Sequence, residues 1–401
     1  MAPCVESAVV VGGGIAGTVA AMALQQAGID VAIYERHRRD EADIGAFLTF
    51  AVNGMDALAS IGAADAVLGH GFSTPLLSFT SGTGRHLGTV PLGGELRDGT
   101  STLTIKRADL CSALRAEAAR RGIDVVHGAQ LIGAETFSGR VRARFADGTH
   151  ADGDVIVGAD GIHSSLRAVI DPAAPVPRYV PVLNVGGYAH PAGLEPDSGT
   201  FHMTFGKRAF FGYSIAPDGT AWWFANPPRR REPQPGELGA ISDSQWRAEL
   251  HELFDGDATP AAAIIDATPD GLVGWATYDL PKVPRWHRDA MIVIGDAAHA
   301  TSPSSGQGAS LAIEDAVILA QCLRDASTVD AAFGAYESKR RTRVEKIVAA
   351  GARSSNSKAA GPIGRRLRDA FMPMYLEKLS SGDPKAAFMF DHHIEWSSPV
   401  R

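Results

Sequence analysis

A glycine-rich turn near the N-terminus constrains the fold of this 401-residue chain more than any other feature. Gly12, Gly14 and Gly17 match the pattern G-x-G-x-x-G directly after an apolar, valine-rich run over 8–11. In this pattern the first glycine permits a tight turn, the second lets a pyrophosphate approach the backbone, and the third lets helix and strand pack closely. The segment therefore predicts a strand–helix–strand unit that binds a dinucleotide.

The flanking residues support this reading. Ile15 and Ala16 begin the helix, where backbone amides face the phosphates of a bound nucleotide. A second strand over 31–34 leads to Glu35, about 20 residues on, where an acid can accept hydrogen bonds from a ribose. Arg36 follows directly as a further candidate contact. The alternative is a tight turn with a solvent-exposed Glu35 and no ligand.

Composition excludes several classes of protein. Hydrophobic residues make up 45% of the chain and charged residues 21%, as in an ordinary globular protein. A net charge of -7 and an isoelectric point near 6.0 give no general attraction to nucleic acid or anionic membranes. Cys4, Cys111 and Cys322 lack metal-binding spacing and indicate reduced thiols. We expect a cytoplasmic protein with no bound metal, no nucleic-acid partner and no membrane partner.

Two further pairs of acid and glycine follow apolar runs. Asp160-Gly161 comes after a predicted buried strand over 155–158, and Gly295-Asp296 comes after the apolar run 290–294. A loop of small residues and a clear helix follow the last pair. A nicotinamide dehydrogenase would usually continue with alternating strands and helices, whereas this chain leaves the nucleotide unit and returns to it.

Taken in order, the three motifs resemble the single-component flavoprotein aromatic hydroxylases with a para-hydroxybenzoate hydroxylase-like fold. The segment DVIVGADGIHSSLR is similar to the family's Asp-Gly motif, and GDAAHATSPSSGQG is similar to its Gly-Asp motif. The resemblance spans about residues 8–345. It implies a mixed α/β fold: a Rossmann-like FAD-binding domain over 1–174 and 286–345, an inserted antiparallel-sheet substrate domain over 175–285, and C-terminal helices over 346–401.

The resemblance also assigns roles to individual residues. It places Asp296 near the FAD ribitol, Arg107 in contact with the cofactor, and Pro303 beside the reactive side of the flavin, where its rigid ring shapes the oxygen pocket. The helix starting near Ala309 would point its positive end at the flavin edge. The predicted FAD-binding residues are Gly12, Gly14, Ile15, Ala16, Gly17, Glu35, Arg36, Arg107, Leu131, Asp160, Asp296, Gly306, Gly308, Ala309 and Ser310.

Three titratable residues near the third motif have competing readings. His299 is a candidate general base, but the resemblance favours a structural hydrogen bond. Glu314 and Asp315 fall in the early turns of the predicted helix, where acids are expected for dipole and capping reasons alone. We expect all three to be structural.

The region from residue 175 to 284 alternates like antiparallel strands. Aromatic side chains are frequent in it and suit a flat, apolar, electron-rich substrate, although most such residues in a sheet belong to its core. Which face of the sheet meets the substrate is left open, because a bulge would switch the register. The candidate substrate contacts are Thr49, His202, Phe210, Tyr213 and Trp223.

The resemblance implies an overall reaction. NADPH or NADH binds transiently and reduces FAD, O2 adds to give a C4a-hydroperoxide, and one oxygen atom passes to a small or polycyclic aromatic substrate, in natural-product biosynthesis or aromatic catabolism. A single dinucleotide fingerprint fits a transient NAD(P)H. Three alternatives stay open: an FAD-dependent dehydrogenase or reductase, an epoxidase, and a non-catalytic flavin-binding protein. The chain is expected to be a monomer or a homodimer.

Overall fold

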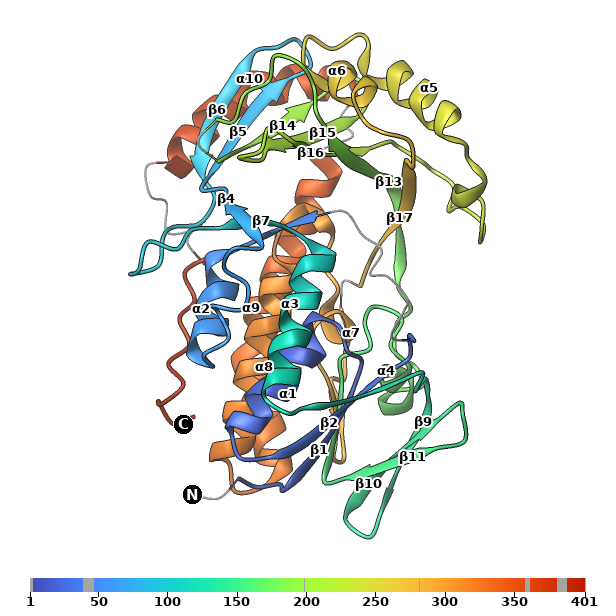
Figure 1. The fold of residues 1–401 in the computed structure, drawn as a ribbon, viewed down its shortest axis with the longest axis vertical. Coiled ribbons are helices and arrows are strands. Elements are labelled where there is room, and N and C mark those ends of the chain that lie inside the picture. Colours follow the sequence, from blue (N-terminus) through green and yellow to red (C-terminus); the bar gives the residue numbers. More distant parts are fainter. Residues whose placement is uncertain are drawn as a thin grey trace.

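Two bodies stacked along the long axis make up the chain (Figure 1). The lower body contains a parallel sheet and the longest helix, and the upper body contains a large, mainly antiparallel sheet. The computed structural model describes residues 3–38, 47–197, 199–280, 282–357, 361–380 and 388–400.

A six-stranded sheet organises the lower body, in the order β18-β19-β12-β1-β2-β8. All neighbours pair in parallel except β18 with β19. The central strands are apolar because the sheet is covered on both faces. The strands are β1 (Ser7–Val11), β2 (Asp30–Glu35), β8 (Asp124–His127), β12 (Val155–Gly158), β18 (His287–Arg288) and β19 (Met291–Val293).

Helices cover one face of this six-stranded sheet (Figure 1). A small antiparallel sheet also packs against the six-stranded sheet. In that small sheet Phe145 stacks on Tyr34 of the parallel sheet, with ring centroids 4.7 Å apart. The covering helices are α1 (Ile15–Gln26), α3 (Arg107–Arg120), α8 (Gly308–Asp325) and α9 (Val329–Ser357). The small sheet consists of β9 (Leu131–Phe137), β10 (Arg140–Phe145) and β11 (His150–Gly153).

The upper body is built on a seven-stranded sheet, in the order β17-β13-β16-β15-β14-β5-β6. It includes two strands from outside the predicted substrate domain of 175–285, because β5 pairs in parallel with β14. Such a pairing joins segments far apart in the sequence, so local patterns do not reveal it. The strands are β5 (Leu76–Ser81), β6 (His86–Pro91), β13 (Arg178–Ala189), β14 (Thr200–Phe205), β15 (Phe210–Ile215), β16 (Ala221–Asn226) and β17 (Val273–Asp279).

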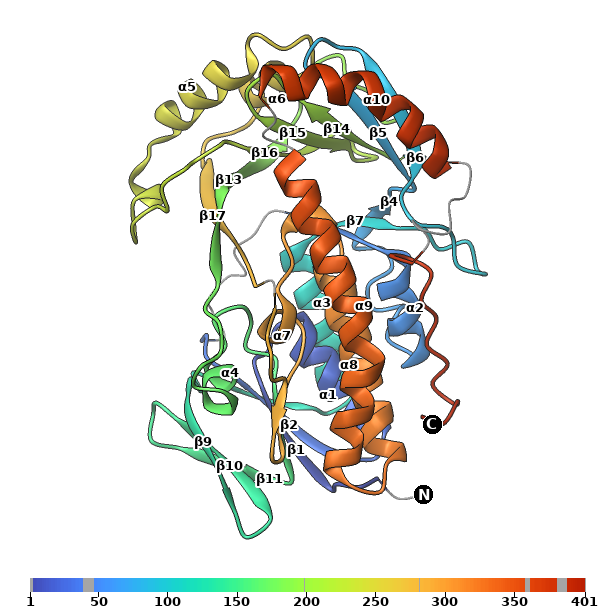
Figure 2. The same cartoon turned by 180° about the vertical axis from the view of Figure 1, so that it is seen from behind.

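The two faces of this sheet pack against different partners. On the outer face, α5 (Asp243–Phe254) and α6 (Ala261–Asp266) bury a core that contains Trp246 and Phe254. The helix α10 (Pro362–Ser380) lies along β5 and β6 at one end of the sheet (Figure 2). The inner face looks toward the lower body.

Short elements join the two bodies. A three-stranded sheet of β3 (Phe47–Phe50), β7 (Leu103–Lys106) and β4 (Gly71–Ser73) lies between them, next to α2 (Val52–Ser60). The remaining short helices are α4 (Ser165–Ile170), α7 (Asp296–His299), and the 3-10 turns η1 (Leu238–Ala240) and η2 (Pro303–Ser305).

The C-terminal part differs from the predicted helical segment over 346–401. The helix α9 crosses the predicted boundary without a break, and residues 388–400 form turns and extended chain beside the lower body (Figures 1 and 2). Side chains of the lower body bind the backbone of this tail: Gln321 Nε2 donates to the Glu395 carbonyl at 2.9 Å. Helical periodicity ends at α10. The tail beyond it is held by tertiary contacts, which a sequence pattern does not reveal.

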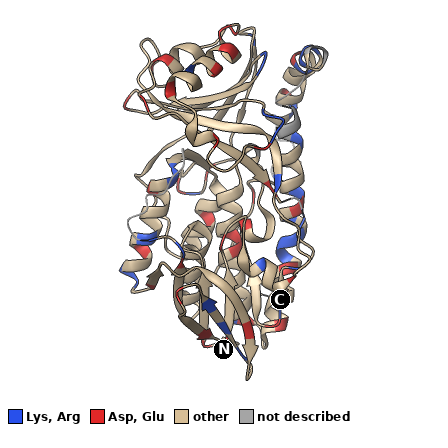
Figure 3. Cartoon of the chain, turned by 90° about the vertical axis from the view of Figure 1, so that its right-hand side faces the viewer, with Lys and Arg blue, Asp and Glu red and all other residues tan. Residues whose placement is uncertain are grey.

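Charged residues are spread over the molecule. Figure 3 shows acidic and basic residues interspersed along the ribbon of both bodies, in keeping with the modest net charge of -7. Within the described ranges, no helix combines the length and the apolar character needed to cross a membrane.

Candidate functional site

A cavity of about 1620 Å³ lies between the two bodies. All three sequence motifs contribute to its lining, although they are far apart in the chain. The loops that carry them follow the carboxyl ends of β1, β12 and β19, the edge at which open parallel sheets bind ligands. The motif residues that line it are Gly14, Ile15, Ala16, Ala159, Gly161, Asp296, Pro303, Gly306, Gly308 and Ala309.

Each glycine of the first motif meets a different steric demand. Gly12 has φ +104°, and a Cβ there would lie 2.4 Å from the Ala159 carbonyl oxygen. A Cβ on Gly17 would lie 1.8 Å from the Gly12 carbonyl oxygen. A Cβ on Gly14 would meet nothing within 4 Å, and this glycine lines the cavity. The first and third glycines thus serve the fold, and the second leaves open space where a phosphate fits.

Glu35 is a structural part of the same turn. Only 8% of it is exposed, which contradicts the reading of a solvent-exposed acid. Its carboxylate accepts hydrogen bonds from the backbone amides of Gly13 at 2.6 Å and His37 at 2.8 Å. Burial alone would raise the pKa of Glu35, but these hydrogen bonds outweigh it and lower the pKa. The acid is therefore ionised and holds the turn, and it lies outside the cavity lining, so its predicted contact with a ribose stays a prediction.

Asp296 presents an unsatisfied carboxylate to the cavity. It begins α7, directly after Gly295 with φ 57°, and its side chain is exposed to the cavity. Within the described residues it accepts no hydrogen bond. Burial raises its pKa, against the opposing effect of the charges on His299 and Arg107. A ligand that donates hydroxyl hydrogen bonds would stabilise this carboxylate, as a sugar alcohol does.

We expect Asp296→Ala to weaken FAD binding by about 10- to 100-fold, because a hydrogen bond to a charged group contributes about 1.5–3 kcal/mol. The measurement is a fluorescence titration of the apoprotein with FAD. An unchanged dissociation constant would show that the carboxylate does not contact the cofactor.

Arg107 also lines the cavity. It begins α3, is exposed to the cavity, and its charge acts on Asp296. We expect Arg107→Ala to lower FAD affinity or to slow reduction of the flavin. The matched control is Arg230→Ala, an exposed arginine outside the cavity lining, which should leave both quantities unchanged. Equal effects of the two substitutions would contradict the placement of the flavin.

The second motif stabilises the loops around the site. Asp160 does not line the cavity; it accepts hydrogen bonds from the amides of Ser165 at 2.7 Å and Leu166 at 3.1 Å, and so caps α4. Burial raises its pKa. Arg167 donates to the Ala297 carbonyl at 2.9 Å and joins this motif to the third. The Asp160 side chain was predicted to contact the cofactor. In the structure it instead holds the loop that leads into α4.

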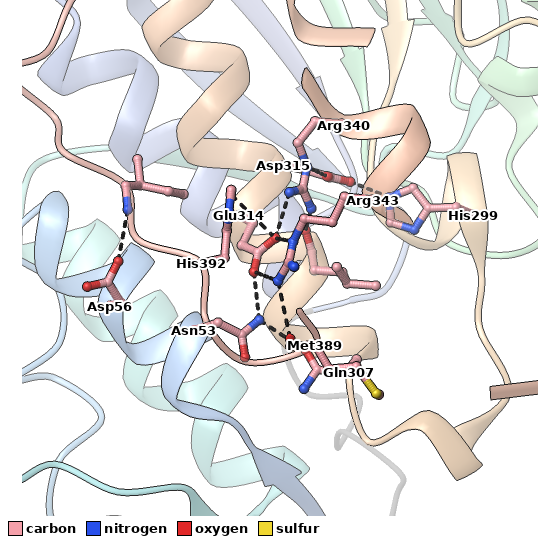
Figure 4. Close-up of polar contacts among 12 residues, drawn as sticks. Asn53, Asp56, His299, Gln307, Glu314, Asp315, Arg340, Arg343, Met389 and His392 are labelled. Carbon is pink, nitrogen blue, oxygen red and sulfur yellow. Dashed lines mark hydrogen bonds and ion pairs between the residues drawn. The ribbon is translucent and has the colours of Figure 1, made fainter. Parts of the chain in front are cut away.

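A buried ion network anchors the third motif (Figure 4). Asp315 accepts from the Gly295 amide at 2.9 Å, from His299, and from Arg340 Nε at 2.6 Å. It thereby fixes the backbone that presents Asp296. Burial acts to raise the pKa of Asp315, but the charges on His299 and Arg340 hold it far below its usual range. His299 is 5% exposed and makes the structural hydrogen bond that was favoured over a general-base role.

Glu314 forms the second half of this network. It accepts from Asn53 Nδ2 at 2.6 Å, Arg340 Nη1 at 2.6 Å and Arg343 Nη2 at 2.9 Å. Both Glu314 and Asp315 are fully buried and lie beyond the first turn of α8, so the expected capping role is wrong. The arginines were missed, although their spacing of three residues places both on one face of α9.

The start of α8 has the features of an anion site. Its first turn carries no side-chain cap, and Gly308 and Ala309 line the cavity. Ser310 behind them is buried, and its hydroxyl has no partner among the described residues. Gly306 has φ 62° and packs near Thr49, whose Oγ1 would lie 3.1 Å from a Cβ at that position. Unpaired amides at this helix end fit the electron-rich edge of a flavin.

Two predicted cofactor contacts lie elsewhere. Leu131 is 4% exposed in the core of the lower body and does not line the cavity. Arg36 is exposed at the end of β2, also outside the lining. Sequence position next to a motif was the only basis for Arg36.

The inner face of the upper sheet forms the opposite wall. Of the predicted substrate contacts, Phe210 and Thr49 line the cavity. The other three lie on the outer face: Trp223 donates to Thr268 Oγ1 at 2.9 Å, and His202 stacks on Tyr213 with centroids 4.6 Å apart. The prediction that these three residues contact the substrate is therefore wrong, because they belong to the core or the outer face of the sheet. The wall residues that the sequence reasoning did not select are Phe47, Phe201, Met203, Phe205 and Phe224.

Comparison with known proteins identifies the family to which the chain belongs. Residues 6–351 match the family model of the FAD binding domain. The chain thus belongs to the FAD-binding-domain family, and within it to the single-component aromatic monooxygenases with the para-hydroxybenzoate hydroxylase-like fold. Among the described residues, three features fit FAD: open space at Gly14, an acid without a hydrogen-bond partner at Asp296, and amides without a side-chain cap at the start of α8.

The names of individual relatives refer to different compounds. The chain is 30% identical over 373 residues to the aurachin C monooxygenase/isomerase of Stigmatella aurantiaca, with 92% of each chain covered. It is 30% identical to the 6-hydroxynicotinate 3-monooxygenase of Pseudomonas fluorescens, covering 84% of this chain and 88% of that one. The structure of Klebsiella pneumoniae HpxO with FAD and uric acid matches with 25% identity, a TM-score of 0.81 and 96% coverage of both chains.

Proposed function

We propose that the protein is an NAD(P)H- and O2-dependent FAD monooxygenase that hydroxylates an aromatic substrate. The observation that carries the proposal is a single cavity with an FAD-type floor, containing Gly14 and Asp296, and an aromatic wall that includes Phe201 and Phe224. A flat ring between floor and wall would lie against the reactive part of the cofactor. The relatives named for hydroxynicotinate and urate point to the same class of substrate.

Bound FAD supplies the redox chemistry, taking a hydride from NAD(P)H and activating O2. The protein supplies position, charge and exclusion of water. Asp296 would hold the sugar-alcohol hydroxyls, and Arg107 would lie beside the cofactor. The amides at the start of α8 would stabilise negative charge on the reduced ring by about 0.3–2 kcal/mol. Pro303 lines the cavity, and its rigid ring would restrict access of water to the flavin.

Oxygen uptake separates this proposal from its rivals. FAD-loaded protein is mixed with NADPH or NADH and a set of phenols, indoles, quinolones and polycyclic aromatics. The proposal requires substrate-dependent O2 uptake and a product heavier by one oxygen atom. A dehydrogenase would turn over with another electron acceptor in the absence of O2, an epoxidase would act on isolated double bonds, and a flavin carrier would show no turnover.

Pro303 provides a test of coupling. We expect Pro303→Gly to keep FAD bound but to divert part of the NAD(P)H consumed into hydrogen peroxide, because a looser lining admits water. Product, peroxide and NAD(P)H are measured in one assay. The same ratio of product to NAD(P)H as in the wild type would exclude a role for Pro303 in shaping the oxygen pocket.

We also propose a cytoplasmic location, which the three cysteines support because none is joined in a disulfide.

A further inference from the structure

The cavity extends well beyond the motif residues. It measures about 1620 Å³ and, on the proposed function, holds both FAD and the substrate. Its lining continues from the nucleotide turn at Gly14, past the inner face of the upper sheet, to Leu379 of α10. The far end therefore has room for a part of the ligand that the ring and the flavin do not occupy.

A continuous row of aromatic side chains leads into this far end. Phe201 and Phe224 lie 6.2 Å apart by ring centroids, Phe224 and Phe210 lie 6.0 Å apart, and Phe210 and Phe205 lie 5.2 Å apart. Phe79 of β5 continues the row, stacked 6.0 Å from Phe205. All five rings line the cavity. The row begins close to Phe47 at the junction of the two bodies, 6.0 Å from Phe201.

Apolar side chains close this branch from the other side. The helix α10 crosses β5 and β6 (Figure 2), and its residues Met372, Leu376 and Leu379 line the cavity. Leu376 packs with Phe205 and Phe210 in one hydrophobic cluster. We define the apolar branch by these residues: Leu77, Phe79, Val90, Phe205, Phe210, Met372, Leu376 and Leu379.

Polar side chains line other parts of the cavity. Asn184 and Thr277 stand on β13 and β17, at the opposite side of the sheet from β5 and β6, and Asn226 of the central strand β16 pairs with Phe210. Asp296 and Arg107 stand on the floor. The site is thus divided into a polar part suited to a ring with hydrogen-bonding substituents and an apolar part suited to a hydrocarbon.

We propose that the substrate carries an extended hydrocarbon chain, alkyl or isoprenoid, attached to its aromatic ring, and that this chain lies in the apolar branch. The proposal rests on the function proposed above and narrows its substrate class. Each methylene group transferred from water to such a surface should tighten binding about 4-fold. A ring without the chain leaves the branch unfilled and binds weakly.

The test uses 4-alkylphenols with methyl, butyl and octyl chains as probes, titrated into the FAD-loaded protein below the concentrations at which they aggregate. Flavin absorbance reports binding, and O2 uptake with NAD(P)H reports turnover. We expect the dissociation constant to fall steeply from methyl to octyl. Equal dissociation constants along the series would overturn the proposal.

Two methionines of α10 make a matched pair of variants. Met372 lines the branch, whereas Met374 is 63% exposed and lies outside the lining. We expect Met372→Trp to weaken octylphenol binding at least tenfold and to leave methylphenol binding unchanged, while Met374→Trp changes neither. Preserved octyl affinity in Met372→Trp, or equal losses in both variants, would show that the chain binds elsewhere.

The two readouts separate this proposal from the proposed function. Chain-length dependence that responds to Met372→Trp, without product containing added oxygen, would support the apolar branch and contradict monooxygenation. Added oxygen in short-chain phenols, with no dependence of affinity on chain length, would support monooxygenation and overturn the apolar branch.

Discussion

Replacing Arg340 with methionine should lower the free energy of unfolding by about 3–5 kcal/mol, the cost of removing one partner from a buried ion pair. The guanidinium is fully buried and donates to Glu314 and Asp315, each at 2.6 Å. Without it, two buried carboxylates lose their shared partner. Denaturant titration of the apoprotein measures the change. The variant should also bind FAD less tightly, because Asp315 holds the Gly295 amide that precedes Asp296.

The control is Lys339→Met, one residue earlier in α9 and exposed, which should change the free energy of unfolding by less than about 0.5 kcal/mol. The network also sets a pH dependence. The folded protein lowers the pKa of both Glu314 and Asp315. Their contribution to the free energy of unfolding is therefore fully present above the pKa values of the unfolded chain, which lie near 4, and it is lost as the pH falls below those values. Equal losses in both variants would contradict a special role for Arg340.

Two alanine substitutions in the glycine turn should have opposite consequences. Gly17→Ala should lower the free energy of unfolding by an amount near the upper end of about 1–3 kcal/mol, because its Cβ would lie 1.8 Å from a backbone carbonyl oxygen that must move. Gly14→Ala should change that free energy by less than about 1 kcal/mol, because open space surrounds its Cβ. It should instead weaken FAD binding about tenfold or more, by blocking the close approach of the pyrophosphate.

Denaturant titrations of both apoproteins and fluorescence titrations with FAD give the four values needed. Unchanged FAD affinity in Gly14→Ala would contradict the position of the pyrophosphate. Unchanged stability in Gly17→Ala would show that the turn relaxes more easily than its geometry indicates.

The sequence predicted the floor of the site because that floor depends on local signals. A β-branched run, glycines at fixed spacing and an acid such as Glu35 are visible within a short segment, and the resemblance joined the three motifs. Their convergence at one sheet edge follows from parallel strand pairing. Leu131 and the Asp160 side chain were wrongly placed because position near a motif does not state which way a side chain points.

The aromatic wall was predicted less well because it depends on strand pairing. Phe205 pairs with Phe210 across β14 and β15, so residues of odd number on one strand share a face with residues of even number on the next. Because the sequence left open which face meets the substrate, the predicted contacts included both Phe210, on the inner face, and Trp223, on the outer face. Neither the contribution of β5 nor the link from Glu314 to Arg340 leaves a local pattern in the sequence.

The central claim is that this cavity transfers oxygen from O2 to an aromatic ring, and isotopic labelling tests it most directly. FAD-loaded protein, NAD(P)H and the aromatic compound that stimulates O2 uptake most are incubated with isotopically labelled dioxygen in unlabelled water. We expect the product to gain one labelled oxygen atom. Product oxygen derived only from water, or full turnover without O2 in the presence of another electron acceptor, would contradict it.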